Sequence, residues 1–237
     1  MIGFTPSRKE SNMARESLEI SAMDSPDRRI TIGRPSASQY LVRGDKQERM
    51  LRILLSRTQP KRTWYSIAKE AESSYGSAHR FLSELSKKGF IDKAGVRDPS
   101  SLFRYWATRK DKRLFREYHV QNPDAVLRDM DMDYLLTGYF AEGLVGGYLF
   151  PRFREFYVMA KNAKEWDSTL MTKGVAGRGN VKVILADDHV FYERQEIEGW
   201  PVVSVQQLIV DLMRTGAECA EAADLLIRRE YIDRATV

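Results

Sequence analysis

The chain has 237 residues, enough for one large domain or two small ones, and its apolar content of 43% is sufficient for ordinary hydrophobic cores. No apolar run approaches the length of a transmembrane helix, and the N-terminal sequence lacks the apolar core of a secretory signal. We therefore expect a cytoplasmic protein with no membrane partner. The single cysteine, Cys219, excludes an intramolecular disulfide framework and a cysteine-based zinc site.

The net charge of +5 conceals an uneven distribution. Residues 1–112 contain 23 Lys and Arg against 13 Asp and Glu, a net charge of +10, whereas residues 113–237 contain 15 against 20, a net charge of −5. A basic surface attracts polyanions, because contacts with phosphates release bound counterions. Many solvated surfaces are also charged, so the balance alone does not identify nucleic acid. The asymmetry nevertheless indicates that the two halves have different functions.

Residues 1–44 are rich in Ser, Arg, Pro and Met and show no sustained helical or strand period. Pro6, Pro26 and Pro35 interrupt any long helix. We therefore expect a flexible basic arm, whose arginines either contact phosphates or simply keep the segment soluble.

The next segment, residues 45–108, has the order of elements of a winged helix-turn-helix. Apolar residues at helical spacing predict three helices, over residues 46–57, 63–72 and 75–88. Gly89 stands where a helix commonly ends, and Phe90 opens a short predicted strand. A turn and a returning strand over residues 102–107 complete the predicted wing.

The stretch from Ser74 to Ile91 carries the main functional signal. Ala78, Phe81, Leu82 and Leu85 form its apolar stripe. A serine beside an aliphatic residue, an arginine, a Leu–x–x–Leu segment and a Lys–Gly–Phe–Ile ending are supplied by Ser77, Ala78, Arg80, Leu82, Leu85, Lys88, Gly89, Phe90 and Ile91. In this pattern the stretch resembles the recognition helix of winged helix-turn-helix regulators. The resemblance implies a helix that enters the major groove of DNA and brings its N-terminal residues to the base edges.

The face opposite the apolar stripe supplies the candidate DNA contacts. Arg80 is the expected base reader, because arginine can bind a guanine edge through two hydrogen bonds. A phosphate contact, or an ion pair with Glu84 one turn away, is the alternative for Arg80. The residues expected to contact DNA, including those before the second helix and in the wing, are Lys61, Arg62, Ser74, Tyr75, Ser77, His79, Arg80, Ser83, Lys87, Arg97 and Arg104.

Residues 109–122 are predicted to be a charged connector, and residues 123–237 a C-terminal α/β domain with a small sheet and packed helices. Periodicity predicts helices over residues 134–148 and in the segments that follow Ser204 and Gly216. Strands are expected over residues 155–160, 181–186 and 190–194. The whole chain is therefore expected to be an α+β protein.

No strong catalytic constellation occurs in the C-terminal half. Asp187, Asp188 and His189 suit a metal or acid–base site, but a turn between two strands favours Asp for ordinary reasons. The glycines of residues 143–147 lack any known phosphate-binding pattern, so close helix packing explains them better. Residues 174–180 could hold an anion through Arg178, but a plain flexible loop is the favoured interpretation. We therefore predict no catalytic residue, no cofactor, no metal ion and no enzymatic activity.

Two segments of this half carry a further resemblance. The first is LTGYFAEGLVGGYLFP, at residues 136–151. The second, within residues 181–227, includes Pro201, Val202, Val203, Ser204, Gln207, Leu208, Asp211, Leu212, Ala222, Ala223, Asp224, Leu225 and Leu226. These segments resemble the C-terminal domain of the AbiE-type antitoxin family (AbiEi), whose layout also includes an N-terminal winged helix. The resemblance implies a repressor that binds an inverted repeat upstream of its own gene and counteracts a toxin resembling a nucleotidyltransferase.

The sequence therefore predicts a sequence-specific DNA-binding transcriptional regulator that represses its own gene and acts as an antitoxin. One alternative is a protein-interaction module that mainly holds a toxin and binds DNA weakly. The other alternative is an enzyme acting on nucleic acid, with Asp187 and Asp188 as metal ligands.

Overall fold

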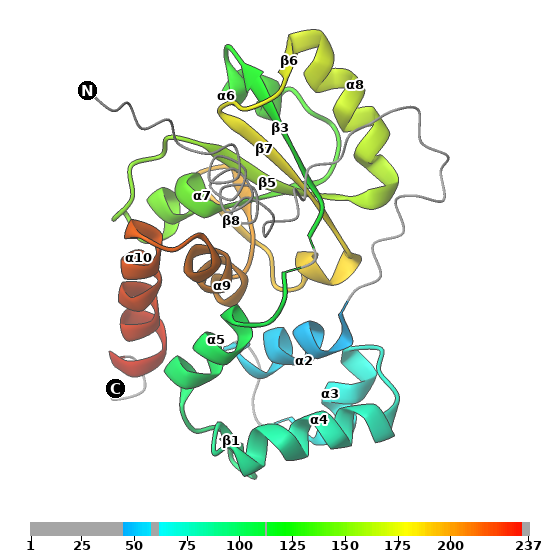
Figure 1. Cartoon of the computed structure of the whole chain (residues 1–237), viewed down its shortest axis with the longest axis vertical. Helices are drawn as coiled ribbons and strands as arrows, with labels where there is room; N and C mark the ends of the chain where they lie inside the picture. Colours follow the sequence, from blue (N-terminus) through cyan, green and yellow to red (C-terminus); the bar gives the residue numbers. More distant parts are fainter. Residues whose placement is uncertain (1–44, 58–61, 112, 234–237) are drawn as a thin grey trace, which may run out of the picture.

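The computed structural model describes residues 45–57, 62–111 and 113–233, and it shows a mixed α+β protein with a multi-stranded sheet (Figure 1). The coarse prediction of an α+β fold is confirmed. The expected basic arm, residues 1–44, lies outside the described residues. Among the described helices, none combines the length and the hydrophobicity needed to cross a lipid bilayer.

Three short helices open the described chain, each close to its predicted position. They are α2 (Lys46–Leu54), α3 (Trp64–Glu70) and α4 (Tyr75–Lys87). Each begins at a polar side chain that accepts backbone N–H groups of the first turn, namely Asp45, Thr63 and Ser74. Their apolar stripes pack into one core, and Gly89, at a φ of 77°, ends α4 in the left-handed conformation that glycine tolerates best.

A small hairpin follows α4, and then a helix that the sequence did not predict. Strands β1 (Ile91–Asp92) and β2 (Gly95–Val96) pair antiparallel, and α5 (Pro99–Ala107) comes next. The predicted returning strand over residues 102–107 is therefore wrong. Asp98 caps α5, and Pro99 suits its first turn. Leu102, Phe103 and Trp106 then share one fully buried helical face, which outweighs the strand preference of the two aromatic residues.

The rest of the described chain is built on a mixed seven-stranded sheet, ordered β6-β3-β7-β5-β4-β9-β8. The strands are β3 (Phe115–Val120), β4 (Tyr134–Thr137), β5 (Arg154–Met159), β6 (Gly174–Ala176), β7 (Val181–Ala186), β8 (Gln195–Ile197) and β9 (Trp200–Val202). The central pair, β5 and β7, is parallel, with Phe156 opposite Val183. Both strands are buried along most of their length, as expected of strands that are covered on both faces.

Two predicted loops contribute strands to this sheet. The expected connector, residues 109–122, contains β3, which pairs with β6 and β7. The sequence did not predict β3, because its polar residues suggested a solvent-exposed segment. In the structure Arg116 and Tyr118 both donate to the Asp167 carboxylate of a neighbouring helix. The expected flexible loop, residues 174–180, begins with β6.

Two further predictions fail at the other edge of the sheet. The predicted helix over residues 134–148 is strand β4 followed by α7 (Gly138–Val145), and Gly138 marks the change with a φ of 62°. The predicted strand over residues 190–194 is replaced by a short 3₁₀ helix, η4 (Asp188–Phe191). The hairpin expected between residues 181–186 and 190–194 is not formed, and a hairpin occurs instead further along the chain, between β8 and β9. The strands predicted over residues 155–160 and 181–186 are confirmed as β5 and β7.

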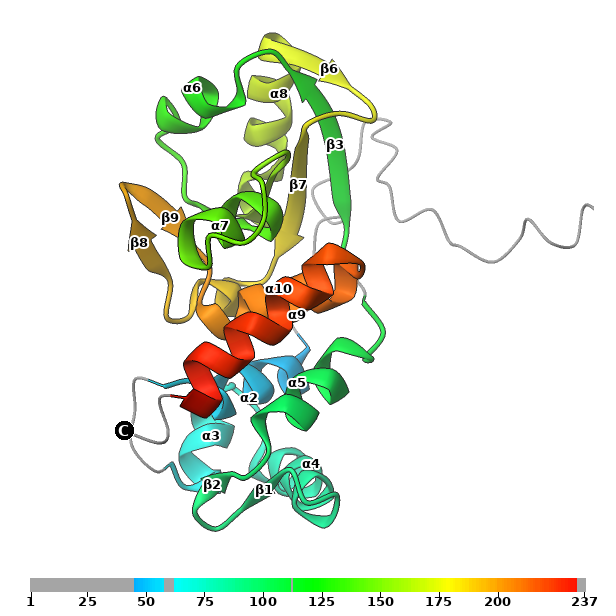
Figure 2. The same cartoon turned by 90° about the vertical axis from the view of Figure 1, so that its left-hand side faces the viewer.

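Helices cover both faces of the sheet (Figure 2). One face packs on α8 (Ala163–Lys173), where the Trp166 ring lies 4.9 Å from that of Phe156, centroid to centroid. Beside α8 lies α6 (Pro123–Arg128). Tyr157 alternates with Phe156 along β5 and therefore points to the opposite face, toward α7 and the helix that follows β9.

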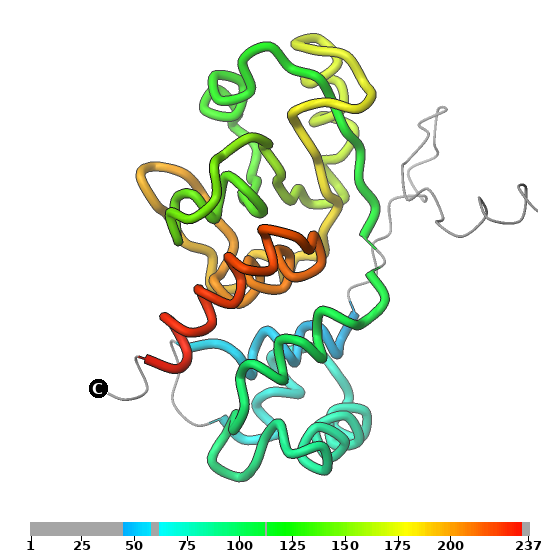
Figure 3. Tube along the Cα trace, turned by 60° about the vertical axis from the view of Figure 1, so that its left-hand side comes forward, coloured from blue at the N-terminus to red at the C-terminus, as the bar shows by residue number. Residues whose placement is uncertain are grey.

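The last helices connect the sheet to the first helices. They are α9 (Val205–Thr215), α10 (Glu218–Ile227) and the π-helical turn η5 (Arg228–Ile232). They confirm the two helices predicted after Ser204 and Gly216. The α9–α10 pair lies between the sheet and the first helices (Figure 3). Consequently α9 is buried on all sides from Gln206 to Leu212, polar residues included.

A polar junction fills the space between α2, α9 and η4. Arg52 of α2 is only 2% exposed, and its Nε and Nη2 donate to Gln207 Oε1 of α9 at 3.0 and 2.7 Å. Its Nη1 lies 2.8 Å from His189 Nδ1 in η4. Since arginine can only donate, this imidazole nitrogen must accept, which requires a neutral ring.

The junction continues into the sheet through a buried carboxylate. Asp211, one turn after Gln207, accepts from Thr137 Oγ1 at 2.7 Å and from Arg113 Nη1 at 2.6 Å. The hydroxyl of Tyr157 donates to the same carboxylate, and Gln207 Nε2 donates to it at 2.9 Å. The buried acid is thus saturated with donors, as a charged group in this position needs to be.

We predict that the protein loses stability as the pH falls from about 6.5 to about 4. The unfolded chain protonates His189 near the ordinary pKa of about 6.5. In the folded protein, burial and the nearby Arg52 guanidinium lower the pKa of His189 to about 4. Between these values the unfolded state binds more protons, so the free energy of unfolding falls with pH, by roughly 2 kcal/mol after allowance for the partial exposure of the ring.

Urea denaturation on either side of this pH window measures the effect, and His189→Gln is the matched variant. A glutamine oxygen can accept the Arg52 hydrogen bond but does not titrate. The variant should therefore show a smaller loss of stability over the same window. An equal loss in both proteins would show that His189 is not responsible.

Candidate nucleic-acid interface

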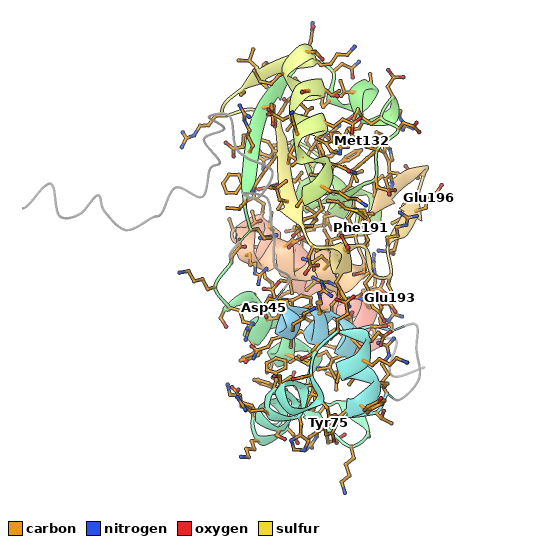
Figure 4. All side chains as sticks on the ribbon, turned by 90° about the vertical axis from the view of Figure 1, so that its right-hand side faces the viewer. Asp45, Tyr75, Met132, Phe191, Glu193 and Glu196 are labelled. Carbon is orange, nitrogen blue, oxygen red and sulfur yellow. The ribbon has the colours of Figure 1, made fainter. Side chains whose placement is uncertain are left out.

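Helix α4 lies along the end of the molecule farthest from the sheet (Figure 1). Its predicted stripe is fully buried, so the opposite face is presented to solvent as expected. Figure 4 shows Tyr75, the first residue of α4, at this end and Met132 in the opposite half of the molecule. The outer face includes a shallow depression lined by Gly76, His79, Arg80, Ser83, Glu84 and Lys87.

Arg80 is exposed near the middle of this face. The sequence left open an ion pair with Glu84, but Glu84 instead binds Lys88, with Oε1 and Nζ 2.8 Å apart. Within the described residues, no hydrogen bond or ion pair engages Arg80. Its guanidinium is therefore available to a ligand. Lys87, also exposed, extends the positive charge toward the C-terminal end of α4.

The three candidate serines have different positions. Ser74 is the N-cap of α4 and accepts the N–H of Ser77, while its hydroxyl donates to Ser77 Oγ at 3.0 Å. Both serines are exposed at the start of the helix, where backbone N–H groups favour an anion. Ser83 is half-buried, and its hydroxyl lies 3.5 Å from His79 Nδ1.

Tyr75 and His79 belong to a group of rings that the sequence only partly revealed. Tyr75 lies 5.8 Å from His79 between centroids, and Trp64 of α3 lies 5.2 Å from His79. Tyr65, which sequence analysis missed, lies 6.3 Å from Tyr75. Its position outside the buried stripe of α3 was the available signal. Lys69, four residues later on the same face of α3, was missed for the same reason.

Arg62 does not reach this surface. Its guanidinium donates to Glu70 Oε2 and to the Tyr192 hydroxyl, both at 2.6 Å, and its side chain is only 10% exposed. The position of Arg62 therefore does not support the prediction that it contacts DNA. Arg62 lies where the first helices contact the sheet and the helices packed on it, residues 113–233, which we call the sheet portion. Lys61, its predicted companion, lies outside the described residues.

Of the residues predicted to lie in the wing, some are exposed at the hairpin and one lies elsewhere. Lys93, in the turn between β1 and β2, and Arg97, just after β2, are exposed, and Arg97 Nε lies 3.6 Å from Asp92 Oδ2. Arg104 was expected in the wing but lies on α5, where it faces Asp224 of α10 at 3.9 Å. Because the returning strand is a helix, Arg104 is directed away from the hairpin, and its assignment to the wing is corrected.

Much of the positive charge of the first half is used inside the protein. Arg49 is bonded to Glu72 and Asp187, and the Arg57 guanidinium binds the Glu230 carboxylate. Together with Arg52 and Arg62, these arginines attach the helices to the sheet portion. Within the described part of the first half, the exposed cations that show no ion pair are Lys69, Arg80, Lys87, Lys93 and Lys110. The charge count therefore overstates what is available to DNA.

Asp187 and His189, two residues of the Asp187–Asp188–His189 sequence considered above as a metal or acid–base site, have structural roles in this arrangement. Asp187 caps η4 and binds Arg49, His189 accepts from Arg52, and Asp188 is exposed. In the parts of the chain that the structure describes, no cluster of His, Cys, Asp and Glu side chains is arranged to hold a metal ion.

The glycines after α7 accommodate a buried carboxylate. Glu142 is 1% exposed and accepts the backbone N–H groups of Tyr148 and Leu149, the latter at 2.6 Å. A Cβ on Gly146 would stand 1.9 Å from Glu142 Oε1. The N–H groups that a phosphate would need are therefore already occupied by the carboxylate.

A scan against models of known protein families, a search of the curated proteins and a search of the solved structures find no match to this chain.

We predict that Ser74→Ala destabilises the protein by about 1 kcal/mol, because the variant loses the N-cap of α4. Ser83→Ala is the matched control on the same face and should change the stability by less than about 0.5 kcal/mol. Urea denaturation of both variants measures the difference. Equal effects would mean that the cap does not stabilise α4.

Proposed function

We propose that this chain is a sequence-specific DNA-binding transcriptional regulator that reads duplex DNA with α4. The observation that carries the proposal is the outer face of α4. It combines an unpaired Arg80 with exposed Tyr75, His79, Ser77 and Lys87, at an end of the molecule that nothing else in the described chain covers. A helix of this kind fits the major groove.

The order of elements supports a winged helix for the DNA-binding part. Helices α2, α3 and α4 are followed directly by the β1–β2 hairpin, and α3 and α4 are joined by a short turn. In this arrangement the second helix of the pair reads DNA while the hairpin approaches the neighbouring backbone. The wing is small, with two residues in each strand.

The side chains fall into two expected roles. Arg80 is the proposed base reader, because its fork of donors matches a guanine edge. Lys69, Lys87 and Lys93 are proposed to contact phosphates, together with the hydroxyl of Ser77. Phosphate contacts position the protein on the duplex, whereas the contact of Arg80 distinguishes one sequence from another.

We predict that Arg80→Ala weakens binding to the cognate duplex by about 1–3 kcal/mol and relaxes specificity at one base pair. Lys87→Ala should weaken binding to all duplexes alike and reduce the dependence of log K on log salt concentration by about 0.9. Fluorescence anisotropy on the DNA upstream of the gene, compared with a scrambled duplex at two salt concentrations, measures both effects.

Arg178→Ala is the matched control, because Arg178 is an exposed arginine in the sheet portion, far from α4. Its affinity for DNA should equal that of the wild type. Equal binding of the wild-type protein to native and scrambled duplexes would contradict sequence-specific recognition and would leave only the general attraction of a basic surface.

A second role, holding a protein partner, is favoured by an exposed apolar group on the sheet portion. Phe150 is 79% exposed and Tyr148 49%, in the loop that follows α7, and Leu225 is exposed on α10. Tyr148 donates to Glu221, and Arg152 to Glu218, so this loop lies against α10. We propose that this surface binds the partner of an AbiE-type antitoxin, a nucleotidyltransferase-like toxin, and that the chain represses its own gene.

The neighbouring gene tests this role. We predict that its product alone arrests growth, that co-expression of this chain restores growth, and that Phe150→Ser weakens the rescue because a large apolar contact is lost. Arg80→Ala should leave the rescue intact. A neighbouring gene whose expression does not affect growth would exclude the antitoxin role while leaving DNA binding untouched.

A further inference from the structure

Four aromatic rings join the N-terminal ends of α3 and α4. Tyr65 lies 6.3 Å from Tyr75, Tyr75 lies 5.8 Å from His79, and His79 lies 5.2 Å from Trp64, all between ring centroids. Tyr65 is 66% exposed and Tyr75 52%, which makes them two of the most exposed large apolar side chains in the described residues. The rings therefore form a continuous surface on both helices of the helix-turn-helix.

Folding alone does not account for this surface. The core of these helices is made by residues on the opposite face, such as Ile67 and Ala78, and it is complete without the two tyrosines. Within the described residues, the hydroxyls of Tyr65 and Tyr75 take part in no hydrogen bond. Exposed aromatic area of this kind is stabilised when a ligand removes it from water.

The surrounding charges indicate an anionic ligand. Lys69 follows Tyr65 by one helical turn, and Arg80 lies one residue beyond His79, and both cations are free of acidic partners. The nearby acids are already paired: Glu70 with Arg62, Glu72 with Lys46 and Arg49, and Glu84 with Lys88. The surface thus offers planar apolar area inside a positive rim, which fits the bases and phosphates of DNA.

In the major groove, the distinctive apolar group on the base edges is the C5 methyl of thymine. The N-terminal residues of a recognition helix are those that reach the base edges. We infer that Tyr75, supported by Tyr65, contacts thymine methyl groups and so determines part of the sequence specificity. The inference rests on the proposed function, to which it adds a preferred base and a second specificity-determining residue beside Arg80.

Replacement of single thymines by deoxyuridine tests the inference, because it removes only the methyl group. The probe is a duplex selected from a random library by affinity for the full chain. Replacing a thymine that faces Tyr75 should weaken binding about fourfold, the effect of one buried methyl group. Tyr75→Ala should bind the original duplex more weakly and lose this sensitivity, whereas Tyr75→Phe, which keeps the ring, should retain it.

Met171→Ala is the matched control, since Met171 is a large apolar side chain of similar exposure on α8, and it should behave like the wild type. If the wild type selects a sequence but no thymine replacement changes its affinity, or if Tyr75→Ala keeps the sensitivity, the inference is wrong and the proposed function stands. If the library yields no preferred sequence, the proposed function fails as well, and a protein becomes the candidate occupant of the rings.

Discussion

The buried guanidinium of Arg52 is the constraint on which the arrangement of this protein depends. A charged group without access to water costs several kcal/mol unless its donors are satisfied. Gln207 and His189 accept its hydrogen bonds, and they come from α9 and η4, which belong to the sheet portion. Helix α2 is therefore anchored in the second half of the chain, and α2, α9 and η4 share one polar junction.

This junction decides where positive charge remains available. Arg49, Arg57 and Arg62 are paired with acidic residues beside Arg52, so in the described part of the first half these arginines are not available to a ligand at α4. The face proposed to bind DNA keeps a few separated cations around aromatic rings. The acidic sheet portion lies at the opposite end of the molecule from α4 (Figure 1). Salt screens exposed charges over a Debye length of about 8 Å at physiological ionic strength, which limits the repulsion of DNA by that portion. A surface with few cations depends more on base contacts than on general attraction.

The sequence predicted what local periodicity determines and missed what distant partners determine. Helices α2 to α4 and the strands β5 and β7 follow from the spacing of apolar residues, and the end of α4 follows from Gly89, because such signals act over a few positions. Strand β3 was missed because the sequence alone indicates that Arg116 and Tyr118 face solvent. Their partner, Asp167 of α8, is identified only in the structure. Arg62 was assigned to DNA for the same reason, since its partner Tyr192 lies 130 residues away. For charged side chains, periodicity cannot tell a solvated face from one that another part of the chain covers.

A polar junction also fixes orientation more strictly than an apolar one. Hydrogen bonds weaken steeply when their distances or angles change, so the bonds of Arg52, Gln207 and Asp211 favour the observed placement of α2 and α9 on the sheet. The direction of α4 is thus set relative to the sheet, and through Thr137 at the start of α7 relative to the exposed loop around Phe150. Under the proposed function, two chains bound at neighbouring DNA sites would therefore present these loops in a relation set by the spacing of the two sites.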